Sequence, residues 1–154
     1  MKKPKVKLVP IDRNSVKECQ DIVAIVREHY PKSRFPPDVR EIAEGKIHYF
    51  KAFIKNEYVG ITGFYYRYPT MVETVKTIVL KEFRGKGYGK LLSQAIEDHC
   101  IGLGVHKITT AIYSTNYPML NIKMQQGYTI EGYHPHHEEP GIHEYSLGKV
   151  IKEE

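Results

Sequence analysis

Three glycines, each separated from the next by one residue, lie between a strand-like stretch and a helix-like stretch of the chain. They belong to the segment Arg84-Gly85-Lys86-Gly87-Tyr88-Gly89, which also carries basic side chains. Glycine lets the backbone approach an anion closely, and the first turn of a helix has unpaired N–H groups that point toward such an anion. The segment therefore predicts a phosphate-binding turn at the start of a helix.

Two common phosphate-binding motifs do not describe this turn. The P-loop requires Gly-Lys followed by Ser or Thr, whereas Leu91 follows Gly89 and Lys90. The spacing of the three glycines also differs from the G-x-G-x-x-G fingerprint of dinucleotide-binding proteins. The turn therefore belongs to neither class.

The turn and two later segments resemble a known family. Arg84-Gly85-Lys86-Gly87-Tyr88-Gly89 matches the Q/R-x-x-G-x-G/A signature of the GNAT superfamily of acetyl-CoA-dependent N-acetyltransferases. Ser114-Thr115-Asn116 and Gln126-Gly127-Tyr128 resemble that family's N…lGF segment. The resemblance covers the second half of the chain by motif and the first half by the order of elements. It implies acetyl-CoA as co-substrate and an amine as acceptor.

The resemblance also assigns residues to the cofactor. In the family, the pantetheine arm adds like a strand to the backbone of the signature strand, here Ile78 and Val79. Asn116 matches a family position that touches the same arm, and it can cap a helix at the same time. The expected cofactor-binding residues are Ile78, Val79, Arg84, Gly85, Lys86, Gly87, Tyr88, Gly89, Lys90 and Asn116.

Transfer to an amine requires a group that removes a proton from the amine. Glu73 lies upstream of Arg84 in the predicted signature strand. It shares one face of that strand with Val75, Thr77 and Val79. Some members of the family keep a catalytic glutamate at the corresponding place, so the resemblance makes Glu73 the candidate base. A solvent-facing strand carboxylate is the alternative interpretation.

The candidate acid departs from the family pattern. The position of the family's usual tyrosine, downstream of Asn116, is occupied by Lys123. An ordinary lysine pKa of about 10.4 makes Lys123 a reluctant proton donor near neutral pH, although burial would lower that pKa. Tyr113, Tyr117 and Tyr128 are hydroxyl alternatives. Lys123 and Tyr113 are therefore the candidates for this role.

A histidine-rich stretch, His134-Pro135-His136-His137-Glu138-Glu139, precedes the end of the chain, with His143 beyond it. Imidazoles and carboxylates at this density can bind zinc or nickel. The stretch can also be a plain loop between the last two strands, or part of the acceptor site. Because it lacks the H-E-x-x-H spacing of metal sites, we expect no bound metal.

The elements that must position these groups follow from hydrophobic periodicity and turn residues. We predict the order β-α-α-β-β-β-α-β-α-β-β, with a continuous signature strand over 73–80. Apolar stripes predict the buried faces of two helices: Val16, Cys19, Ile22, Val23, Val26 and Tyr30 in the first helix, and Leu91, Leu92, Ala95, Ile96, Cys100 and Leu103 in the helix after the glycine turn. This order predicts an α/β fold with a mixed, mostly antiparallel sheet flanked by helices, and it is also the order of the GNAT fold.

Composition sets broader limits. The 154 residues, 41% hydrophobic and 27% charged, predict a single domain over residues 1–154. No apolar run is long enough to span a membrane, and no signal-peptide pattern is present. Cys19 and Cys100 fall on apolar helix faces, so we expect buried free thiols and a cytoplasmic protein.

The net charge of +5 raises the question of nucleic acid as a partner. Lys2, Lys3, Lys5 and Lys7 could contact nucleic acid, but a solvated first strand explains them more simply. No nucleic-acid-binding signature accompanies this charge, so this partner is not expected.

The sequence thus predicts an N-acetyltransferase that moves an acetyl group from acetyl-CoA to an amine in a ternary complex. The signature segments contain no cysteine, which argues against a covalent acetyl-enzyme. The alternative is a non-catalytic acyl-CoA-binding sensor on the same fold, supported by Lys123 in place of tyrosine. The identity of the amine and the choice between monomer and homodimer stay open.

Overall fold

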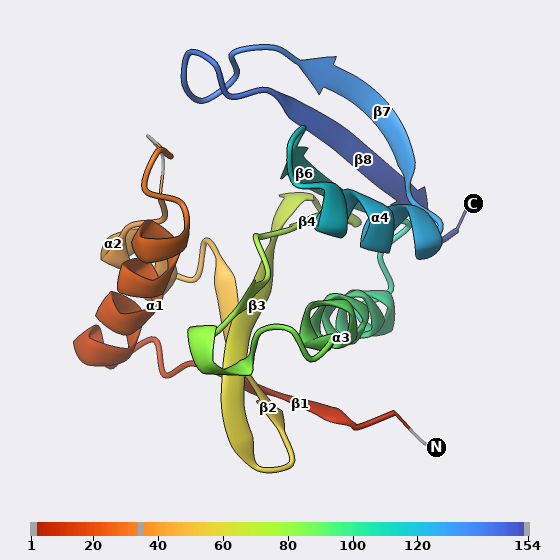
Figure 1. Ribbon diagram of the computed structural model, residues 1–154. Helices are drawn as coiled ribbons and strands as arrows, with labels where there is room; N and C mark the ends of the chain where they lie inside the picture. The colour runs from red at the N-terminus through yellow and green to blue at the C-terminus, as the bar shows by residue number, and fades with distance from the viewer. Residues whose placement is uncertain (1–2, 34–35, 153–154) are drawn as a thin grey trace.

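The computed structural model describes residues 3–33 and 36–152, and Figure 1 traces their path. The first seven elements are β1 (Val6–Pro10), α1 (Val16–His29), α2 (Val39–Ala43), β2 (His48–Ile54), β3 (Glu57–Tyr68), β4 (Met71–Thr74) and β5 (Ile78–Val79). A single 3₁₀ turn (Lys81–Phe83) leads to α3 (Tyr88–Gly102), β6 (Lys107–Tyr113), α4 (Tyr117–Gln125), β7 (Thr129–His134) and β8 (Glu144–Val150). The order of helices and strands is the predicted one, except that the signature strand is divided into β4 and β5.

The strands form one mixed sheet. Its order is β1-β2-β3-β4-β6-β8-β7, with β5 pairing to β3 beside β4. The β4–β6 pair is parallel, whereas the other pairs are antiparallel. The predicted mixed, mostly antiparallel α/β fold is therefore confirmed.

The prediction of a continuous strand over 73–80 is wrong. Thr74 lies opposite Phe64 of β3, and Ile78 lies opposite Ile61. Residues 75–77 therefore face residues 62–63, which is one residue more than regular pairing allows. An extra residue of this kind is a β-bulge, and it bends the strand that contains it.

The bulge opens the sheet between β4 and β6. These two strands pair only where residues 71–73 of β4 meet residues 107–109 of β6. Beyond this point β4 bends away, while β6 stays paired with β8 as far as Tyr113. The edges formed by residues 74–77 and 110–113 are consequently left facing each other.

Helices cover both faces of the sheet (Figure 1). Buried side chains of α1 and α2, such as Ile22 and Ile42, pack with Tyr49 on one face. On the other face, Ile96 of α3 packs with Phe50, and α4 packs against the same cluster. Consecutive residues of β2 therefore point to opposite cores, as the pleat requires.

Two side chains predicted to be buried are exposed. Val16 is 61% exposed and Leu103 is 41% exposed. Val16 is the first residue of α1, and Leu103 follows the last residue of α3. Both predictions fail because these residues continue the apolar spacing of their helices but lie at helix ends that do not face the sheet.

Smaller predictions are also decided by the fold. Cys19 and Cys100 are buried free thiols, as expected. Lys3, Lys5 and Lys7 are exposed, and Lys7 lies between the apolar residues Val6 and Leu8 of β1. Lys2 lies outside the described residues. None of the helices within residues 3–33 and 36–152 is long and apolar enough to cross a membrane.

Candidate active site

The glycine turn leaves the start of α3 open. Gly85 and Gly87 have φ angles of +80° and +77°, in the left-handed region that favours glycine. A Cβ atom at either position would meet nothing within 4 Å, so packing does not require glycine here. Gly87 is the N-cap of α3 and provides no side chain to its first N–H groups. These N–H groups are therefore available to an anion.

Basic side chains surround the open turn. Arg84 Nε donates a hydrogen bond of 3.2 Å to the carbonyl oxygen of Val79, which ties the turn to β5. Arg84, Lys86 and Lys90 are exposed. The first turn of α3 contains no acidic residue that would oppose an anion. Tyr88 and Gly89 form the first turn of the helix itself.

A narrow slot lies between the separated edges of β4 and β6. Residues 74–77 line one side and residues 110–113 line the other, while Asn116, Met119 and Lys123 contribute to its wall. Asn116 Oδ1 also accepts a hydrogen bond of 3.3 Å from the Met119 N–H, so it caps α4 as predicted. Ile78 and Val79 lie one step beyond the slot, where β5 pairs with β3.

A larger pocket of about 410 Å³ adjoins the slot. Five residues line both spaces: Tyr30, Thr74, Val75, Lys76 and Ala111. The pocket contains many acidic and aromatic side chains from distant parts of the sequence. They are Glu41, Glu73, Glu138, Glu144, Tyr30, Tyr49 and Tyr65.

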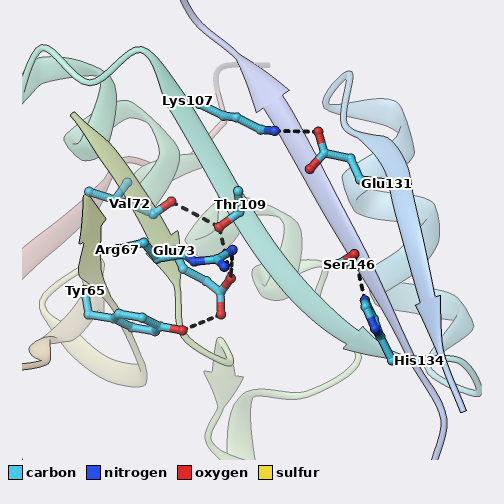
Figure 2. A network of polar contacts seen from close by, with 9 residues as sticks. All are labelled: Tyr65, Arg67, Val72, Glu73, Lys107, Thr109, Glu131, His134 and Ser146. Atoms are coloured by element: carbon cyan, nitrogen blue, oxygen red, sulfur yellow. Dashed lines mark hydrogen bonds and ion pairs between the residues drawn. The ribbon is translucent and has the colours of Figure 1, made fainter. Parts of the chain in front are cut away.

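Glu73 lies in this pocket and is held by three side chains (Figure 2). Tyr65 donates a hydrogen bond of 2.5 Å, Thr109 Oγ1 donates one of 2.9 Å, and Arg67 lies at 3.4 Å. The Glu73 side chain is only 19% exposed. Burial raises the pKa of Tyr65, and the hydrogen bond to Glu73 raises it further, so the phenol keeps its proton. Glu73 is therefore a fixed, largely buried carboxylate.

Glu138 joins four segments at the boundary between slot and pocket. Its Oε2 accepts hydrogen bonds from Ser33 Oγ at 2.8 Å and from the Tyr113 hydroxyl at 3.3 Å. Its Oε1 lies 3.6 Å from Lys76 Nζ. Burial disfavours the charged form of Glu138, but Lys76 and these hydrogen bonds hold its pKa below the ordinary value. Tyr113 is thus placed where slot and pocket meet.

Glu144, the residue that follows the histidine-rich loop, is 4% exposed. Burial raises the pKa of Glu144 and outweighs the attraction of Lys76, while repulsion from Glu138 adds to the rise. Sequence reasoning missed Glu144, and it included Glu138 only within a stretch for which the acceptor site was one of several interpretations. Glu138 was marked only by the density of its stretch, and no pattern marks Glu144, because its role arises from pairing opposite Tyr113.

Lys123 is buried, with 3% exposure. Burial lowers its pKa to about 8, although attraction by Glu97 opposes the change. Its Nζ lies 4.7 Å from the centre of the Tyr128 ring. Glu97 is already bound by Lys149, whose Nζ is 3.2 Å from each carboxylate oxygen. The ammonium therefore belongs to a buried group on the α3 side, while its residue also lines the slot.

The other hydroxyl alternatives are placed differently. Tyr117 is 71% exposed on α4, and Tyr128 is 3% exposed within the core. Tyr113 is the tyrosine of these three that lines the slot. Burial raises the pKa of Tyr113, and the neighbouring Glu138 charge raises it further.

The histidine-rich stretch is mainly a loop whose histidines form hydrogen bonds within the loop itself. His143 Nδ1 accepts from the His136 N–H at 2.9 Å, and His136 Nδ1 accepts from the Gly141 N–H at 2.8 Å. His134 lies 3.0 Å from Ser146 Oγ (Figure 2). His137 lines the pocket, so part of the stretch does form a wall of the candidate acceptor site. Within the described residues, no three His, Cys, Asp or Glu side chains are grouped to hold a metal ion.

The parted strands form a slot that adjoins an acidic pocket, and the glycine turn leaves the start of α3 open. Together these features can hold an extended phosphate-bearing ligand next to a second molecule. The sequence model described as the acetyltransferase (GNAT) family matches residues 18–128. The chain therefore belongs to this family. A comparison with curated proteins gives no match.

Solved structures show the same fold at low identity. A mutant form of the spermidine/spermine N-acetyltransferase SpeG from Vibrio cholerae superposes with a TM-score of 0.76 at 13% identity, covering 95% of this chain and 94% of that one. The aminoglycoside 6'-N-acetyltransferase from Enterococcus faecium gives 0.70 at 16%, covering 96% and 98%. The IAA acetyltransferase from Bacillus cereus ATCC 14579 gives 0.71 at 17%, covering 96% and 100%. These neighbours share the fold, whereas the acceptors in their names differ.

Proposed function

We propose that this protein transfers the acetyl group of acetyl-CoA directly to an amine within a ternary complex. The observation that carries this proposal is the continuity of the two spaces. The slot between β4 and β6 and the acidic pocket share five lining residues. A donor in the slot and an acceptor in the pocket would therefore meet inside the protein.

The donor would be held mostly by the main chain. The open N–H groups of the glycine turn and α3 suit the pyrophosphate, and the exposed basic side chains add attraction. The facing edges of residues 74–77 and 110–113 suit the amide-containing pantetheine arm, because an extended chain can add to a strand edge. Ile78 and Val79 keep these edges in place by pairing with β3.

The acceptor amine must lose a proton before it can attack the thioester carbonyl. Glu73 is the proposed base, since its carboxylate lies in the pocket and is fixed by three donors. As the nitrogen–carbon bond forms, the carbon–sulfur bond breaks and the thiolate leaves. A thiol with a pKa of about 8.5 is a fair leaving group, so a proton from Tyr113 or Lys123 would assist departure without being essential.

Both cysteines argue against an acetyl-enzyme intermediate. A cysteine nucleophile reacts as the thiolate and needs access to the donor. Burial raises the pKa of Cys100 to about 12 and also raises that of Cys19. Neither residue lines the slot or the pocket. Direct transfer is therefore the simpler route.

The second candidate function is an acyl-CoA sensor without turnover. It is favoured by Lys123, which replaces the family's usual tyrosine. The Lys123 ammonium is buried and lies over the Tyr128 ring, so it is not a free proton donor in the slot. The test is thiol release from acetyl-CoA in the presence of a panel of amines, with calorimetric acetyl-CoA binding measured in parallel. Turnover with at least one amine is expected. Tight binding without turnover by any amine would favour the sensor.

A further inference from the structure

The candidate acceptor pocket is lined by more acidic than basic side chains. Glu41 comes from α2, Glu73 from β4, Glu138 from the histidine-rich loop and Glu144 from β8. Lys76 is the one lysine or arginine among the described residues that line the pocket. Such an excess of one charge raises the local concentration of a ligand with the opposite charge.

Three of these carboxylates already have donors. Glu41 Oε1 accepts from the Asp38 N–H at 3.2 Å, and Glu73 is bound by Tyr65, Thr109 and Arg67. Glu138 is paired with Lys76, as described above. Their charges are therefore stabilised by groups of the protein itself.

Glu144 differs from these three in one of its two oxygens. It is almost completely buried, and it lines the pocket. Its Oε1 has no hydrogen-bond partner among the described residues. A buried acceptor without a donor destabilises the folded protein, and a charged one does so more strongly. The pocket therefore ends in a carboxylate that a ligand with an N–H donor would satisfy.

The surroundings of Glu144 already stabilise one ammonium. Lys76 Nζ lies 4.9 Å from the centre of the Tyr30 ring and 4.6 Å from that of the Tyr113 ring. Aromatic faces attract cations in this way, and the effect grows when water is excluded. Tyr30 and Lys76 both line the pocket, so this end of it is suited to positive charge.

We propose that the acceptor is a small amine with a second positive charge, and that Glu144 together with Glu138 binds the ammonium that is not acetylated. Aliphatic diamines and amino sugars both have this chemistry. The proposal rests on the proposed function, because it assigns the pocket to the acceptor. Glu73 would act on one amine while the Glu138–Glu144 pair holds the other.

The first experiment compares three ligands with the same four-carbon chain. Putrescine has two ammonium groups, n-butylamine has one, and γ-aminobutyrate has one ammonium and one carboxylate. We expect kcat/KM for putrescine to exceed that for n-butylamine by roughly 10- to 100-fold, the worth of one hydrogen bond to a charged group. γ-Aminobutyrate should be the poorest substrate because its carboxylate would face Glu144. Neamine and spermidine then separate an amino-sugar acceptor from an aliphatic one.

The second experiment uses Glu144→Gln and Glu138→Gln. Each should lower kcat/KM for putrescine by roughly 10-fold or more and lower that for n-butylamine by a smaller factor. Glu131→Gln is the matched control, since Glu131 pairs with Lys107 on the surface and lies outside the pocket. Melting temperature and acetyl-CoA affinity are measured for each variant, which separates a folding defect from a binding defect.

The outcomes distinguish this inference from the proposed function. Equal kcat/KM for putrescine and n-butylamine, or equal losses for both in the variants, would overturn the inference while acetyl transfer stands. If no amine is acetylated, the binding of putrescine is measured directly by calorimetry. Binding that Glu144→Gln weakens would then support the cation site without the enzyme, and no binding would overturn it.

Discussion

The two halves of the candidate site are built in different ways. The donor half consists mostly of main chain, from the exposed glycines and the open start of α3 to the facing strand edges of the slot. The acceptor half consists of buried and half-buried side chains from segments as distant as Ser33 and Glu144. The donor half therefore depends on backbone shape, whereas the acceptor half depends on particular carboxylates and tyrosines. A family can keep the first half and change its substrate through the second.

Each half also contains one buried ionisable group that is pushed toward its neutral form. Burial lowers the pKa of Lys123 beside the slot and raises that of Glu144 in the pocket. Lys123 has an aromatic ring and Glu97 near it, whereas Glu144 faces another carboxylate. This difference favours a structural role for Lys123 and a ligand-binding role for Glu144.

The largest expected effect is on the donor half. Gly87→Glu should abolish the rise in melting temperature that acetyl-CoA causes by mass action. The new side chain and its negative charge would enter the open space expected for phosphate. Gly104→Glu is the matched control, because Gly104 also has a left-handed φ of +81° and open space around its Cβ position. If acetyl-CoA raised the melting temperatures of both variants equally, the glycine turn would not be part of the cofactor site.

The next effect is on the acceptor half. Glu73→Gln should lower turnover by roughly 10²–10⁴-fold, the usual contribution of a positioned acid or base. Acetyl-CoA affinity should stay unchanged, because Glu73 does not line the slot. Steady-state kinetics and calorimetry measure the two quantities. Activity within a few-fold of wild type would show that Glu73 is not the base, and Glu144 or Glu138 would become the candidate.

A smaller effect is expected for Lys123. Lys123→Met should lower turnover by less than about 10-fold, because thiolate departure does not depend on it. At pH 7 the variant should be more stable than wild type, since an apolar residue replaces a buried ammonium. This gain should shrink as pH rises from about 8 toward the ordinary lysine pKa, where wild-type Lys123 becomes neutral in both states.

Turnover and melting temperatures between pH 6 and pH 10 test this prediction. Lys123→Tyr is the companion variant, because a phenol restores the family's usual group at this position. A complete loss of turnover in Lys123→Met with intact acetyl-CoA binding would show that Lys123 is needed for chemistry.

Glu144→Gln should have a modest effect on stability that depends on pH. Because the folded-state pKa of Glu144 is raised, wild type loses stability as pH rises from the ordinary carboxyl pKa through the raised one. The variant should therefore melt at a higher temperature than wild type at pH 8 and at the same temperature near pH 4. An advantage that is constant across this range would assign the effect to packing instead of ionisation.

No effect is expected from metal removal. The Nδ1 atoms of His136 and His143 are occupied by backbone N–H groups of their own loop. Treatment of untagged protein with a chelator should leave activity and melting temperature unchanged. Elemental analysis that finds about one tightly held metal per chain would contradict this.

The difference between the halves also explains what could be predicted from sequence. The glycine turn, the Asn116 cap and the order of elements are local features, so spacing alone indicated them. The division of the signature strand was missed because β-branched residues continue through 75–79, and the bulge follows from pairing with β3. Glu144 was missed, and Glu138 was not singled out from its stretch, because both reach the pocket only through tertiary contacts. The burial of Lys123 likewise depends on α3 and Tyr128.

The parting of β4 from β6 has a mechanical consequence. Only three residue pairs join these strands, so the two parts of the sheet are connected by a short seam. Glu73 and Thr109 form the last of those pairs, and their side chains are also hydrogen-bonded. The carboxylate proposed as base is therefore fixed at the short seam between the two parts of the sheet. A ligand that bridged the slot would reinforce this seam and steady the carboxylate at the moment both substrates are present.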